Sequence, residues 1–308
     1  MKIDQKIDQS ASHLPRTQAI VPVAEWGWDA GVRCGARLLG RGLNICPGTK
    51  FQVRMIKLGT SGFSYDDWIG PFYPADLPKR DWLGYYANRL DTVELNVTYY
   101  RLPGLKTVQA WVEKNPPEFT FAVKAHQGLT HVREEPDFPA FANSIRPLID
   151  SGKLACVLAQ FPHSFHPNAE NRAYLERLRN GLGELPTVVE FRDAAWVSED
   201  TFDHLQSLEL GFCCVDEPRL KGLMPPVALA TGPVAYVRLH GRNAAKWWTH
   251  EHAWERYDYS YSDDELSEWV PRIRELDQTA PLTLVYANNH YRGQSVQTVE
   301  QLGRLLSQ

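Results

Sequence analysis

From residue 55 onward, short apolar segments typical of buried strands alternate with amphipathic segments that have a helical period. The strand patterns cover residues 56–60, 92–96, 119–124, 155–160, 187–191, 212–215, 235–240 and 282–287. The helical patterns cover residues 79–90, 105–114, 139–150, 169–182, 199–208, 263–277 and 296–306. Eight strand–helix repeats in about 250 residues predict an α/β fold, a single (β/α)8 barrel of the TIM type.

An open, doubly wound sheet is the alternative that this alternation allows. Its first strand should lead into a glycine-rich turn that holds a dinucleotide. The turn at residues 59–62 reads GTSG, which lacks that spacing, so the barrel is favoured. Residues 217–232 are rich in Pro and Gly where a helix should follow strand six. We therefore predict an irregular connection between strands six and seven.

Local signals support several helix boundaries. Ser262 and Glu265 have the spacing of a capping box, and Ser198 is well placed as an N-cap. Pro271 lies inside the helical pattern 263–277 and should kink that helix.

Residues 1–54 show no sustained helical or strand period. They contain three prolines and no apolar stretch long enough for a signal peptide. We expect a disordered or non-native N-terminal extension, with Met55 as the natural first residue of the barrel domain 55–308.

Charge and cysteine usage limit the protein's partners and location. Residues 1–54 hold eight Lys and Arg against four Asp and Glu, a net charge of about +4. Because the net charge of the whole chain is −4, residues 55–308 carry about −8. An acidic body argues against broad contact with nucleic acid. The five cysteines form no zinc pattern and suggest no disulfides. No apolar run is long enough for a membrane span, and we expect a cytoplasmic protein of undetermined oligomeric state.

Polar residues follow nearly every strand pattern, where the carboxyl ends of barrel strands build active sites. The stretch TVVEFRDAAW, residues 187–196, shows this best, because Glu190 and Arg192 share one face of a strand that is otherwise apolar. Buried charges are costly unless they are paired or used. We predict three catalytic candidates: Glu94 and Glu190 as general bases, and His240 as an acid–base group. Glu190 and Arg192 have a second interpretation as part of a structural salt-bridge ring.

Three cations, Lys124, Arg192 and Arg238, should make a local positive site in this acidic protein. The predicted ligand is therefore anionic, either a small molecule or a nucleic-acid end. Asp216 is also expected at this end of the barrel, where its favoured role is to cap the following loop, and Arg242 is a further candidate cation. The remaining expected substrate-binding residues are Asn96, Gln160, Asn288, Asn289, Trp196 and Tyr65. We assign no metal ligands and no cofactor, and leave dependence on a divalent metal open.

Seven segments in this order resemble the YecE-like family, also called domain of unknown function 72. They read KLGTSGFSYDDWIGPFYP (57–74), VELNVTYYRLP (93–103), FTFAVKAH (119–126), VLAQFP (157–162), VEFRDAAW (189–196), YVRLHGR (236–242) and NNHYRG (288–293). The resemblance implies a TIM-type barrel. It implies no settled activity, because the family is uncharacterised.

Three functions remain open from the sequence. The first is a hydrolase- or lyase-like enzyme that acts on a phosphate-bearing substrate, such as a nucleotide, a nucleic-acid end or a sugar phosphate. The second is a glycoside hydrolase that uses Glu94 and Glu190, favoured by an aromatic loop at residues 247–261. The third is a non-catalytic barrel that binds nucleic acid or a partner protein.

Overall fold

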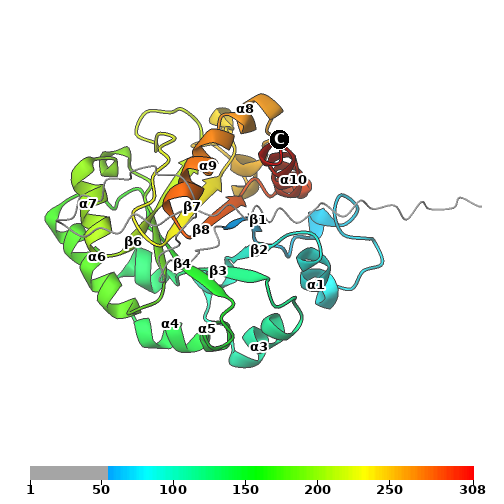
Figure 1. The fold of residues 1–308 in the computed structure, drawn as a ribbon, viewed down its shortest axis with the longest axis horizontal. Helices are drawn as coiled ribbons and strands as arrows, with labels where there is room; N and C mark the ends of the chain where they lie inside the picture. Colours follow the sequence, from blue (N-terminus) through cyan, green and yellow to red (C-terminus); the bar gives the residue numbers. More distant parts are fainter. Residues whose placement is uncertain (1–54) are drawn as a thin grey trace, which may run out of the picture.

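The computed structural model describes residues 55–308, and the extension expected over residues 1–54 lies outside them. Eight parallel strands in this range close a barrel in sequence order, because β1 pairs with both β2 and β8 (Figure 1). The strands are β1 (Met55–Ser61), β2 (Thr92–Leu95), β3 (Thr120–Lys124), β4 (Leu154–Gln160), β5 (Thr187–Glu190), β6 (Leu210–Asp216), β7 (Val234–Leu239) and β8 (Leu282–Ala287). The predicted barrel and all eight strand patterns are confirmed.

Helices surround the strands, as Figure 1 shows. They are α1 (Trp82–Ala87), α2 (Val97–Tyr100), α3 (Leu105–Glu113), α4 (Phe138–Ser144), α5 (Arg146–Asp150), α6 (Ala169–Leu182), α7 (Glu199–Ser207), α8 (Asp263–Ser267), α9 (Val270–Thr279) and α10 (Gln294–Leu306). In residues 55–308 no helix is long and apolar enough to cross a membrane. The connection from β6 to β7 contains no helix, so the predicted irregular connection is confirmed.

Two helical patterns of the sequence are each divided in the structure. The pattern 139–150 forms α4 and α5, and the pattern 263–277 forms α8 and α9. Pro271 stands in the first turn of α9, where its missing N–H leaves no helical hydrogen bond unmade. The expected kink is therefore a complete break. The capping box of Ser262 and Glu265 and the Ser198 cap are both present.

The core has two parts, one inside the barrel and one between the strands and the helices. Strand side chains alternate between them. The outer part is strongly aromatic: Phe165, Phe191 and Trp196 form a stack in which neighbouring ring centroids are 4.2–6.3 Å apart. The inner part becomes polar toward the carboxyl ends of the strands, which we call the mouth of the barrel.

Candidate functional site

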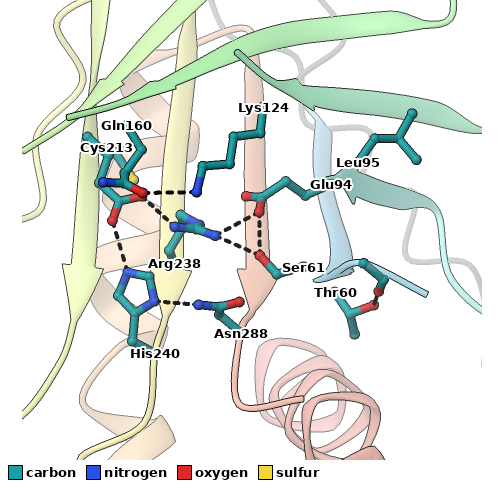
Figure 2. A network of polar contacts seen from close by, with 12 residues as sticks. Thr60, Ser61, Glu94, Leu95, Lys124, Gln160, Cys213, Arg238, His240 and Asn288 are labelled. Carbon is teal, nitrogen blue, oxygen red and sulfur yellow. Dashed lines mark hydrogen bonds and ion pairs between the residues drawn. The ribbon is translucent and has the colours of Figure 1, made fainter. Parts of the chain in front are cut away.

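Arg238 lies at the centre of the polar network in the barrel. β7 places it inside, where its Nη1 donates to Glu190 Oε2 at 2.6 Å. Its Nη2 donates to Glu94 Oε1 at 2.7 Å and to Ser61 Oγ at 2.9 Å (Figure 2). The Ser61 hydroxyl also donates to Glu94. One guanidinium therefore joins β1, β2, β5 and β7 and neutralises charge on two buried carboxylates.

Alternation along the strands explains which side chains reach this network. Thr60 and Leu95, the strand neighbours of Ser61 and Glu94, point away from it in Figure 2. Pairing of β1 with β2 sets Ser61 directly beside Glu94. Tyr236, two residues before Arg238 on β7, donates its hydroxyl to Glu94 Oε2 at 2.7 Å. Both oxygens of Glu94 are thus occupied by protein donors.

Glu190 is the second carboxylate of the network and is completely buried. Besides Arg238, it binds Arg192 Nη2 at 2.7 Å and His240 Nε2 at 3.2 Å, both through Oε1. Burial alone would raise the pKa of Glu190, but Arg192 and Arg238 outweigh it and hold the pKa well below its usual range. Glu190 is therefore an ionised acceptor.

His240 lies between Glu190 and Asn288 and is completely buried. Asn288 Nδ2 is 2.9 Å from His240 Nδ1 (Figure 2), so Nδ1 accepts this hydrogen bond. Nε2–H then donates to Glu190. Burial, aided by the charge of Arg192, lowers the pKa of His240 to about 4. The ring is neutral at pH 7, and both of its nitrogens are engaged.

Glu217 is a buried carboxylate that the sequence analysis did not assign to the site. Its Oε2 lies 3.7 Å from Arg192 Nη1, and its Oε1 accepts from the Met224 amide at 2.8 Å. Burial raises the pKa of Glu217 to about 7, although Arg192 opposes the shift. Arg192 therefore faces Glu190, which is ionised, and Glu217, which titrates near neutrality.

Asp216, expected at the mouth, faces the opposite way. Arg242 binds it through Nε at 2.8 Å and Nη2 at 3.0 Å, and Tyr261 donates to it at 2.7 Å. Asp216 is the last residue of β6, as expected, but its side chain binds Arg242 and Tyr261 and not the network around Arg238. Arg242, which also binds Glu268 at 3.0 Å, is therefore not part of the cation cluster.

Lys124 enters the mouth from the end of β3 and is half-buried. Its ammonium donates to Gln160 Oε1 at 2.9 Å (Figure 2). The ammonium also lies 4.6 Å from the centre of the Tyr99 ring. Unlike Arg192 and Arg238, it forms no ion pair with any residue in 55–308. Burial, followed by repulsion from Arg238, lowers the pKa of Lys124 to about 8.

The structure divides the other predicted substrate-binding residues into two groups. Gln160 and Asn288 contact the network directly. Asn96 follows β2, and its buried Oδ1 has no hydrogen-bond partner among residues 55–308. Tyr65, in the loop after β1, donates to Ser61 O at 2.6 Å and stacks on His290 at 4.6 Å. These four residues surround the same end of the barrel.

Trp196 and Asn289 do not reach the mouth, and their expected role needs correction. Trp196 is completely buried in the outer aromatic stack, with its indole N–H donating to Phe165 O. Asn289 is also completely buried and donates to Tyr259 O at 2.8 Å and to Thr298 Oγ1 at 2.9 Å. Asn289 has the opposite parity to Tyr286 and Asn288, which reach the barrel interior, so alternation turns it away from the mouth. Trp196 lies six residues after the end of β5, in a 3-10 turn where alternation no longer applies.

The aromatic loop after β7 is partly packed and partly exposed. Trp247 is buried, whereas Trp248 is 58% exposed and Trp254 stacks on Tyr291 at 4.2 Å. Within the part of the chain that the structure describes, no group of three or more His, Cys, Asp or Glu side chains is arranged to hold a metal ion.

Comparison with known proteins adds a family to this geometry. The family described as protein of unknown function DUF72 matches residues 57–308. The UPF0759 protein YunF of Bacillus subtilis (strain 168) is 33% identical over 270 residues, which cover 82% of this chain and 95% of YunF.

Solved structures show the same similarity. A DUF72 family protein (TM1631) from Thermotoga maritima is 38% identical, with a TM-score of 0.77 over 82% of this chain and 100% of that one. A DUF72 family protein (EF0366) from Enterococcus faecalis is 29% identical, with a TM-score of 0.74 over 82% of this chain and 96% of that one. Sequence and fold agree over the whole barrel, and the chain belongs to the DUF72 family.

Proposed function

We propose that this protein is an enzyme that binds a small anionic substrate, of the phosphate-bearing class, at the mouth of the barrel. The observation that carries the proposal is that the Lys124 ammonium forms no ion pair with any residue in 55–308. Its ammonium is half-buried beside Gln160 and Tyr99 and has no carboxylate partner within residues 55–308. An unpaired cation in a partly desolvated site favours an anion, because low polarity strengthens their attraction.

The charge balance of the mouth supports the same ligand class. Its cations are Lys124, Arg192 and Arg238, and its carboxylates are Glu94, Glu190 and Glu217. Because the pKa of Glu217 is raised to about 7, this carboxyl group is partly protonated at neutral pH. The cluster then carries a small positive charge, although the body of the protein is acidic.

Arg192 connects substrate binding to the catalytic candidates in this proposal. It is only 14% exposed at the side chain, whereas Glu94, Glu190 and His240 are completely buried. A substrate anion that draws Arg192 away from Glu190 would free one lone pair of Oε1, which still accepts from His240, to take up a proton. The His240 N–H would hold the same carboxylate in position, so Glu190 acts as the base and His240 orients it.

The first prediction concerns sulfate, which keeps its charge between pH 6 and 9 and serves as a simple anion. Sulfate should raise the melting temperature of the wild-type protein, because a ligand that binds only the folded state stabilises it. Lys124→Met should weaken sulfate binding by about 10- to 100-fold, the loss of one charge-assisted contact of about 1.5–3 kcal/mol. The affinity should fall as the pH rises from 6.5 to 9, as Glu217 and then Lys124 lose their protons.

Lys106→Met is the matched control for this experiment. Lys106 lines a separate basic groove of about 470 Å³ between α1 and α3, together with Lys79, Arg80 and Lys114. The control should bind sulfate as the wild type does. Sulfate binding that depends on Lys106 and is indifferent to Lys124 would place the anion in that groove and refute the proposed site.

The glycoside hydrolase is less well supported by the geometry. Such an enzyme needs space for a sugar between its two carboxyl groups and keeps one of them protonated. Here the Arg238 guanidinium lies between Glu94 and Glu190 and binds both, and the pKa of Glu190 is held low.

Sulfate binding at the mouth without any turnover of phosphate esters would favour a non-catalytic binder.

A further inference from the structure

Three lysine side chains of the barrel differ sharply in how their ammonium groups are satisfied. Lys153 donates to three backbone carbonyls, those of Val112, Asn115 and Pro116, at 2.7–3.1 Å. Lys57 donates to Glu118 O at 2.6 Å and to Thr120 Oγ1 at 3.2 Å. Because an ammonium has three donors, Lys153 is fully occupied and Lys57 largely so.

Lys124 has a single hydrogen-bond acceptor among the described residues, Gln160 Oε1. Its other near neighbour is the face of Tyr99, whose ring also lies 5.1 Å from that of His131. Burial and the charge of Lys124 lower the pKa of His131 to about 4, so this imidazole adds no charge at pH 7. The amine is therefore held by one hydrogen bond, and Arg238 and Arg192 act on it as nearby cations.

We propose that Lys124 is a nucleophilic amine that forms an imine with a carbonyl group of the substrate. The inference rests on the proposed function, which already sets this side chain against the ligand. It narrows the substrate to a small anionic aldehyde or ketone. Lysines desolvated beside other cations are activated in this way in enzymes that use imine chemistry.

The reaction needs no oxidant or metal. The lone pair of neutral Nζ adds to the carbonyl carbon, the C=O π bond breaks, and the oxygen takes up a proton while nitrogen releases one. The carbinolamine hydroxyl takes up a proton, the C–O bond breaks and water leaves, while the nitrogen lone pair forms the C=N bond of the protonated imine. Return of water regenerates the amine, so the chain ends unchanged.

The electrostatic surroundings increase the reactive fraction of the amine. With a pKa of about 8, roughly a tenth of Lys124 is neutral at pH 7. An ordinary lysine with a pKa near 10.4 is neutral to about 0.04%, so the advantage is roughly 200-fold before any loss of nucleophilicity. After this loss, Lys124 should still react at least about tenfold faster than an ordinary lysine.

The test is reductive trapping on the full-length protein. Pyruvate or dihydroxyacetone phosphate is added with sodium cyanoborohydride at pH 7, and the modified lysines are located and timed by peptide mass spectrometry. Lys124 should be labelled at least about tenfold faster than exposed Lys106, and its rate should reach a plateau above about pH 8. Sulfate should slow the labelling of Lys124 alone.

Two variants separate chemistry from binding. Lys124→Arg keeps the positive charge but has no nucleophilic amine, so it should retain sulfate binding and lose trapping at this position. Gln160→Glu puts a carboxylate beside the ammonium and should raise its pKa. Labelling of Lys124 at pH 7 should then be several-fold slower than in the wild type and should recover at higher pH. A merely structural defect would slow the labelling at every pH.

The outcomes distinguish this inference from the proposed function. Sulfate binding that depends on position 124, with Lys124 labelled no faster than Lys106, would overturn the imine and leave the anion site standing. Trapping at Lys124 without any sulfate binding would support the imine and count against the anion site. Absence of both would overturn both.

Discussion

At the scale of single residues, the network contains two buried groups whose pKa values are shifted in opposite directions. Burial raises the pKa of Glu217 to about 7 and lowers that of His240 to about 4. Both shifts favour the neutral form in the folded state. Between about pH 4.5 and 6.5 the Glu217 contribution to stability falls with rising pH, whereas the His240 contribution rises, so the two partly cancel in the wild type.

Glu217→Gln should remove the Glu217 contribution to the pH dependence of stability and leave that of His240, because glutamine resembles the protonated acid. The folded pKa of Glu217 lies above its unfolded value, so ionisation costs stability as the pH rises from 4.5 through 7. The variant should match the wild type near pH 4.5 and exceed its stability at pH 8 by up to about 3 kcal/mol. Urea unfolding at a series of pH values measures the difference.

Glu184→Gln is the control for this stability series, because Glu184 is an exposed glutamate. It should follow the wild type across the whole range. An advantage of Glu217→Gln that does not change with pH would show that ionisation of Glu217 is not its source.

At the scale of elements, the close approach of β1 and β2 depends on one glycine. A Cβ atom on Gly59 would lie 2.1 Å from Thr92 O, a backbone atom of the neighbouring strand. Gly59→Ala should therefore force the strands apart and destabilise the protein by about 1–3 kcal/mol or more. Because Ser61 and Glu94 are paired across the same two strands, the change should also weaken sulfate binding.

Gly104→Ala is the matched substitution outside the sheet. Gly104 has φ −71° at the N-cap of α3, and a Cβ there meets no atom within 4 Å. Its unfolding free energy should change by less than about 1 kcal/mol. Equal losses for both glycines in urea unfolding would show that the β1–β2 contact is not the cause.

At the scale of the whole molecule, the barrel is closed by residues 55–308 alone, because β1 pairs with β8 along its length from Met55 to Thr60. We predict that a chain beginning at Met55 unfolds in urea with the same midpoint and slope as the full chain, and binds sulfate equally. A lower midpoint would show that residues 1–54 contribute to stability and would refute the proposed domain boundary.

Local sequence patterns determined the barrel fold and the end of the barrel at which the candidate site residues lie. Helical and strand periods depend on neighbours along the chain, so the eight strands could be predicted without tertiary contacts, whereas Pro271 predicted a kink and not the break between α8 and α9. Alternation along the strands likewise placed Glu94, Lys124, Glu190 and Arg238 at the same end of the barrel.

Only the tertiary structure decided which of these groups are paired and which remain available. Charges from β2, β5 and β7 meet across the barrel, and nothing local indicates that Arg238 binds both carboxylates while Lys124 binds neither. Adjacent Cys213 and Cys214 gave no polar alternation on β6, so the inward position of Glu217 stayed hidden. Trp196 lies in a turn well after β5, where alternation along the strand no longer sets the direction of a side chain.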